Sequence, residues 1–112
     1  MAKVVLHIGT HKTATTTIQD MFALNAGLLA QHGLIYPKLG RMTGHHGLVM
    51  DWNRLPRIYE LEGGSIANLR RIAGEHGSGE GTVFLSSEEF SRGVAAARVD
   101  FTAVREALSG FD

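Results

Sequence analysis

The chain has 112 residues, enough for one small domain, and 44% of them are hydrophobic while 20% are charged, which excludes an intrinsically disordered chain. Eleven basic and eleven acidic side chains cancel, so no general affinity for nucleic acid or acidic lipid is expected. The lack of cysteine excludes disulfides, thiolate catalysis and cysteine-ligated zinc. No apolar run approaches the roughly 20 residues of a membrane span, so we expect a soluble, cytoplasmic protein.

The first half of the chain alternates between strand and helix patterns. A β-branched, apolar run over residues 3–8 predicts a buried strand that ends at Gly9. Residues 14–31 then follow a helical period, interrupted by Asn25. One face of that helix carries Ile18, Met21, Phe22, Leu28 and Leu29. Residues 34–36, bounded by Gly33 and Pro37, predict a short second strand.

The second half begins with the least regular stretch, residues 38–64, in which residues 47–53 are compatible with a short helix. Residues 65–76 predict a helix with Ile66, Leu69, Ile72 and Ala73 facing inward. Residues 82–85 predict another buried strand, and residues 100–108 a final helix. This alternation of strands and helices is typical of an α/β fold with parallel strands.

The loop after the first strand has the composition of an anion site. Ligands of parallel sheets bind where strands end, and a helix N-terminus presents unpaired N–H groups and a partial positive charge. Gly9 allows a sharp turn, Lys12 adds a cation, and hydroxyls follow at Thr13, Thr15, Thr16 and Thr17. The alternative is a capping box, in which Thr16 caps the helix and Gln19 reaches back. That alternative explains a single threonine and leaves Lys12 unexplained.

The stretch HIGTHKTATTTIQ resembles the 5′-phosphosulfate-binding loop of sulfotransferases that use 3′-phosphoadenosine 5′-phosphosulfate (PAPS). That loop has the usual form Lys-[Thr/Ser]-Gly-Thr-Thr after a first strand, and this version is similar to the variant of bacterial sulfotransferase-like proteins. Ala14 stands at the glycine position. A Walker A loop is excluded, because its glycine before the lysine is missing and the spacing is too short.

The resemblance implies a three-layer P-loop-like parallel sheet flanked by helices. Residues 1–112 would form a single domain that is the N-terminal, incomplete part of a sulfotransferase domain. It also implies transfer of a sulfuryl group from PAPS to a hydroxyl-bearing acceptor, without a metal, nucleic acid or membrane span. Lys12 would contact the phosphosulfate and neutralise charge on the leaving phosphate. The cofactor-binding residues would be Gly9, Lys12, Thr13, Ala14, Thr15, Thr16 and Thr17.

The segment after the second buried strand offers candidates for the base that takes the acceptor proton. Ser86-Ser87-Glu88-Glu89 matches a capping box with Ser86 as the N-cap, which leaves Glu88 as the first candidate. Glu89 replaces Glu88 as the candidate base if the cap begins one residue later. His46, in a glycine-flanked histidine pair with His45, is the rival, although a solvated loop is the simpler explanation of that pair.

Two other functions remain open on the sequence. A catalytically incomplete nucleotide- or phosphate-binding module is the first, because no secure partner for the 3′-phosphate is visible in the chain. Such a module would associate with a missing C-terminal part or with itself. A divergent P-loop kinase is the weaker possibility, because the longer glycine loop of that class is absent.

Overall fold

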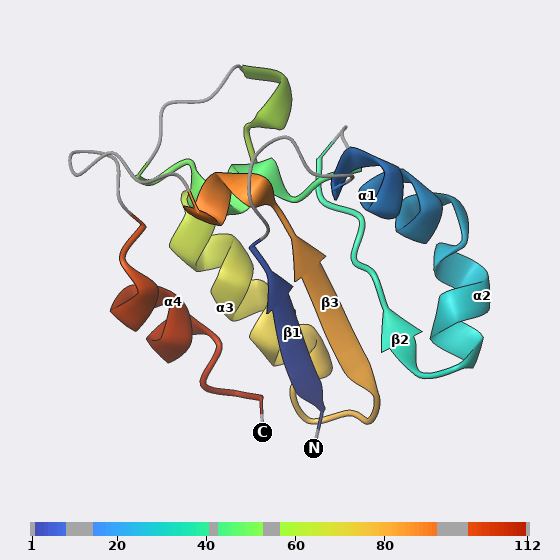
Figure 1. Ribbon diagram of the computed structural model, residues 1–112. Helices are drawn as coiled ribbons and strands as arrows, with labels where there is room; N and C mark the ends of the chain where they lie inside the picture. The colour runs from blue at the N-terminus through green and yellow to red at the C-terminus, as the bar shows by residue number, and fades with distance from the viewer. Residues whose placement is uncertain (1, 9–14, 41–42, 53–56, 92–98, 112) are drawn as a thin grey trace.

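A computed structural model of the chain describes residues 2–8, 15–40, 43–52, 57–91 and 99–111 (Figure 1). Within them, one parallel sheet has the strand order β1-β3-β2. The strands are β1 (Lys3–His7), β2 (Leu34–Ile35) and β3 (Thr82–Ser86). Lys3 lies opposite Thr82 and His7 opposite Ser86, so β1 and β3 end side by side. The predicted α/β fold with parallel strands is confirmed.

The helices follow the predicted order along the chain. The α-helices are α1 (Thr15–Leu24), α2 (Ala26–Gln31), α3 (Gly64–His76) and α4 (Phe101–Ala107). Short 3-10 helices form η1 (His46–Val49), η2 (Arg57–Tyr59) and η3 (Glu88–Ser91). The helices predicted over residues 65–76 and 100–108 are confirmed, with Asp100 capping α4 through a bond from the Ala103 N–H.

Helices lie on both faces of the sheet because successive strand residues point to opposite sides. Val83 and Leu85 of β3 are buried in one apolar core. Helices α3 and α4 contribute Leu69, Ile72, Ala73, Val104, Ala107 and Leu108 to that core. On the other face, the ring of Phe84 contacts the ring of Phe22 in α1, with centroids 4.9 Å apart.

The helical pattern predicted over residues 14–31 forms two helices, α1 and α2, which are separated at Asn25, the residue that interrupts the pattern. Asn25 leaves helical geometry, and its side-chain amide donates to the Met21 carbonyl at 2.8 Å. Such local side-chain bonds compete with regular helix. The predicted apolar face is largely in water: Met21 is 57% exposed and Leu28 55%, whereas Phe22 packs on the sheet.

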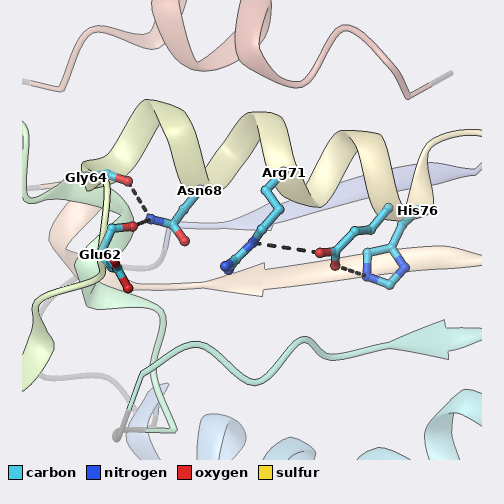
Figure 2. A network of polar contacts seen from close by, with 6 residues as sticks. Glu62, Gly64, Asn68, Arg71 and His76 are labelled. Carbon is cyan, nitrogen blue, oxygen red and sulfur yellow. Dashed lines mark hydrogen bonds and ion pairs between the residues drawn. The ribbon is translucent and has the colours of Figure 1, made fainter.

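Helix α3 is stabilised at its start by side chains from outside its first turn. Asp51 accepts hydrogen bonds from the N–H groups of Ser65 at 3.0 Å and Ile66 at 3.3 Å. The N-cap itself is Gly63, which has no side chain to offer. Figure 2 shows that buried Asn68 donates to the carbonyls of Glu62 and Gly64. The exposed contacts of Arg71 and His76 with Glu75 further along α3 add little stability.

Replacing Asp51 by alanine is expected to lower the free energy of unfolding by about 1–2 kcal/mol, the usual cost of losing a helix cap. The reason is that two N–H groups of the first turn of α3 lose their acceptor. Urea denaturation followed by circular dichroism measures the change. Glu80→Ala, which removes an exposed carboxylate from a turn, is the matched control. Equal stability of the two variants would contradict the capping role.

Candidate functional site

The predicted anion loop connects two described elements at one edge of the sheet. Strand β1 ends at His7 beside the end of β3, and helix α1 begins at Thr15. The predicted binding residues Gly9, Lys12, Thr13 and Ala14 lie outside the described residues. The same holds for the side chains of Thr15 and Thr16, whereas Thr17 is described and exposed. The described part of the candidate site therefore consists of the elements on either side of this loop and the residues packed against them.

Ser86 lies at the centre of this edge and is completely buried. Its hydroxyl shares a hydrogen bond with Nδ1 of His7 at 2.9 Å and accepts one from Nε2 of Gln19 at 3.1 Å. Its carbonyl accepts from the backbone N–H of His45 at 2.8 Å. Ser86 thus connects β1, β3, α1 and the segment of His45 and His46, here called the histidine segment. It belongs to β3 and does not cap a helix.

Gln19 holds helix α1 against the carboxyl end of β3. Its side chain is 1% exposed, and its amide nitrogen lies 3.3 Å from the Ser86 carbonyl as well as bonding the hydroxyl. Because Gln19 is the fifth residue of α1, this contact places the first turn of α1 at the edge where β1 and β3 end. The capping-box alternative gave Gln19 a local role beside Thr16, and no local pattern predicted its contact with Ser86.

His45 is a buried structural residue of the site. Its Nδ1 accepts the Ser86 N–H at 3.0 Å, so the proton of the neutral ring sits on Nε2 and is donated to the Pro37 carbonyl at 2.7 Å. Its ring also stacks on Tyr36, with centroids 4.3 Å apart. Burial lowers the pKa of His45 from 6.5 to about 4 by removing water from the charged ring; the bond to Pro37 opposes this shift and nearby His46 reinforces it. His45 is therefore neutral at pH 7.

His46 is placed beside the segment that follows β3. Its Nδ1 lies 2.6 Å from the hydroxyl oxygen of Ser87, and its ring meets Tyr59 edge-on. Ser87 also accepts the N–H of Glu89 at 3.1 Å. The helical turn after β3 is thus capped by Ser87, and the predicted cap at Ser86 is wrong by one residue. A fully solvated histidine pair is also wrong, because His45 is buried and His46 half-buried.

Gly44 allows the histidine segment to approach α1. A Cβ on Gly44 would stand 2.5 Å from Oε1 of Gln19 and 2.6 Å from Nε2 of His46, closer than real Cβ atoms come. A side chain at position 44 would therefore displace the polar ends of Gln19 and His46. The sequence showed glycines beside the histidine pair, but it did not show that Gly44 approaches Gln19 of α1.

The structure describes two of the three predicted candidates for the base, His46 and Glu89, beside the same residue. His46 and the backbone of Glu89 both lie at Ser87, directly after β3. The side chain of Glu88 lies outside what the structure describes, so its role stays a prediction. His7 is half-buried, and its Nδ1 is hydrogen-bonded to the hydroxyl of Ser86. The edge therefore combines a helix start, a half-buried imidazole and buried hydroxyls, which suits an anionic ligand and proton transfer at His46.

Comparison with protein-family models, with curated proteins and with solved structures finds no match to this chain. Among the described residues, no group of three or more histidine, aspartate or glutamate side chains is arranged to hold a metal ion. The described helices include none with the length and apolar character to cross a membrane.

Proposed function

We propose that this chain belongs to a sulfotransferase with a P-loop-like fold, which transfers a sulfuryl group from PAPS to a hydroxyl acceptor. One observation carries the proposal. The Lys12-threonine segment joins β1 to α1, and Gln19 anchors the first turns of α1 where β1 and β3 end. That is the position at which parallel α/β sheets bind phosphate-bearing ligands.

The proposed chemistry is an in-line transfer between two oxygens. The acceptor oxygen bonds to sulfur while the bond from sulfur to the bridging phosphate oxygen breaks, and 3′-phosphoadenosine 5′-phosphate leaves with the added negative charge. Lys12 and the N–H groups at the start of α1 stabilise that charge, and the threonine hydroxyls orient the phosphate. The acceptor proton passes to a base of the enzyme.

Among the proposed bases, His46 has the strongest support from the described geometry. Ser87 positions its ring beside the end of β3, at the same edge as the start of α1. Burial makes His45 a poor base because its pKa falls to about 4 and both ring nitrogens are bonded. Glu88 and Glu89 remain the carboxylate alternatives, and comparison of His46→Gln, Glu88→Gln and Glu89→Gln in a transfer assay separates the three.

Titration with 3′-phosphoadenosine 5′-phosphate tests the proposal. The wild-type chain is expected to bind it saturably, and Lys12→Ala to bind at least about tenfold more weakly, because one charge-assisted contact is lost. Isothermal calorimetry measures both. Lys3→Ala is the matched control, because Lys3 is exposed at the opposite end of β1.

The results also separate the other two functions. Tighter binding of ATP than of the 3′-phosphorylated nucleotide would favour the kinase-like interpretation. Binding without transfer to any hydroxyl acceptor would favour a binding module. Failure of the wild-type chain to bind either nucleotide would contradict an anion site at Lys12 in this chain.

A further inference from the structure

Ser86 determines which nitrogen of the His7 ring carries the proton. The Ser86 carbonyl can only accept, so the Gln19 group that lies beside it is the NH2 end of the amide. The Ser86 hydroxyl therefore accepts from Gln19 and has its own proton left to donate. Among the described residues, Nδ1 of His7 is the acceptor within reach of that proton, at 2.9 Å. Because Ser86 is completely buried, an O–H without an acceptor would be costly, so Nδ1 stays unprotonated.

The neutral ring of His7 therefore carries its proton on Nε2 and presents a fixed N–H donor. A proton on Nδ1 instead would leave the buried Ser86 hydroxyl without an acceptor. The two nitrogens of an imidazole ring point in nearly opposite directions, so Nε2 points away from Ser86. Within the part of the chain that the structure describes, Nε2 makes no hydrogen bond, and the ring is only half-buried. The donor is thus available to a ligand.

The His7 ring lies on the face of the sheet that helix α1 covers. His7 is opposite Ser86 in the parallel pair, so the two side chains share a face, and the Ser86 hydroxyl bonds Gln19 of α1. The His7 ring also contacts the ring of Phe84, with centroids 5.7 Å apart, and Phe84 contacts α1. His7 ends β1, and Gln19 brings the first turns of α1 to the same edge. One serine hydroxyl thus positions both the Nε2 donor and the start of α1.

We propose that His7 is a phosphate-binding residue of the candidate site, and that its Nε2–H donates a hydrogen bond to a 5′-phosphate oxygen of the bound nucleotide. An N–H that can donate but not accept suits an unprotonated oxygen of a phosphate, and the start of α1 favours the same negative charge. Ser86 and Gln19 are then positioning residues, because they aim the ring and the helix without touching the ligand. The inference rests on the proposed function and adds a residue that the resemblance to sulfotransferases does not imply.

Nuclear magnetic resonance of the ligand-free chain gives the first test. The chemical shifts of the two ring nitrogens of His7, measured at about pH 8 where imidazole is neutral, show which of them is protonated. We expect an unprotonated Nδ1 and a protonated Nε2. Saturation with 3′-phosphoadenosine 5′-phosphate should then shift the resonance of the Nε2 proton and slow its exchange with water. A proton on Nδ1 in the ligand-free chain would overturn the inference without any reference to the nucleotide.

Two substitutions separate the roles of the two ring nitrogens. His7→Asn keeps an acceptor near the position of Nδ1 but has no group at the position of Nε2. It should denature at the same urea concentration as the wild type and bind the nucleotide at least about tenfold more weakly, because a hydrogen bond to a charged group is lost. His7→Gln places an amide N–H near the position of Nε2, so it should bind more tightly than His7→Asn but denature at a lower urea concentration, because Ser86 loses its acceptor.

Isothermal calorimetry measures the binding, and His32→Asn, which replaces an exposed histidine at the end of α2, is the control that should change neither property. Equal affinity of the wild type and His7→Asn would mean that Nε2 meets only water, which overturns this inference and leaves the proposed function standing. Failure of the wild-type chain to bind the nucleotide would overturn both. If His7→Asn is itself destabilised, the Nε2 proton of the wild type decides, and an unchanged resonance on saturation overturns the inference.

Discussion

Replacing Ser86 by alanine is expected to lower the free energy of unfolding by roughly 2–4 kcal/mol, because the substitution leaves buried polar groups without a partner. The hydroxyl of Ser86 bonds Nδ1 of His7 and Nε2 of Gln19, and both Ser86 and Gln19 are buried. The loss should also loosen α1 from the end of β3. Urea denaturation measures the stability, and amide hydrogen exchange of α1 measures the local effect.

Two comparisons make this test specific. Ser78→Ala removes the hydroxyl of an exposed serine and should change stability little. A double-mutant cycle of Ser86→Ala with Gln19→Ala should show a coupling energy of about 1 kcal/mol, because the two side chains share a hydrogen bond. Additive effects of the two substitutions would mean that Gln19 does not anchor α1 through Ser86.

Acid is expected to destabilise the protein through His45. The pKa of this residue falls from 6.5 in an unfolded chain to about 4 in the folded one, mainly through burial, so the unfolded state binds more protons between these values. The stabilisation by the neutral ring is complete above pH 6.5 and is lost as the pH falls to about 4. The difference between the two pKa values corresponds to about 3 kcal/mol.

The structural reason is that a protonated His45 cannot accept the Ser86 N–H at Nδ1. The free energy of unfolding of the wild type and of His45→Gln, measured at half-unit steps from pH 7 to pH 4, tests this. Their difference should shrink by about 3 kcal/mol over that range. His32→Gln, which removes an exposed histidine at the end of α2, should track the wild type. A constant difference for His45→Gln would contradict the assignment.

Under the proposed function, substitution of Ser86 or His45 is expected to affect nucleotide binding as well as stability. Ser86 and His45 hold the histidine segment, β3 and α1 together, and His46 and the start of α1 are both part of the proposed site. Loss of either contact should therefore reduce nucleotide binding indirectly. Lys12→Ala should instead reduce binding without loss of stability, which separates a ligand contact from a structural one.

The sequence by itself determined the parts of the fold that depend on near neighbours. β-branched, apolar runs predicted β1 and β3, the short segment between Gly33 and Pro37 predicted β2, and helical spacing predicted α3 and α4. The loop after β1 and the segment after β3 both follow strands that end at the same edge of the sheet. In the sequence, Asn25 appeared only as a polar residue that interrupts the apolar stripe of the helix. The sequence did not show the hydrogen bond from its side chain to the Met21 carbonyl, which accompanies the break.

Only the tertiary structure decided which polar residues build the site. Gln19 meets Ser86 across 67 positions of sequence, and His45 meets it across 41. No periodicity or turn pattern encodes such pairs, because they depend on how β1, β3, α1 and the glycine-rich histidine segment pack together. Local chemistry thus predicted the strands and the helices α3 and α4, and long-range packing placed the buried groups at the edge where β1 and β3 end. The anion loop stays a prediction.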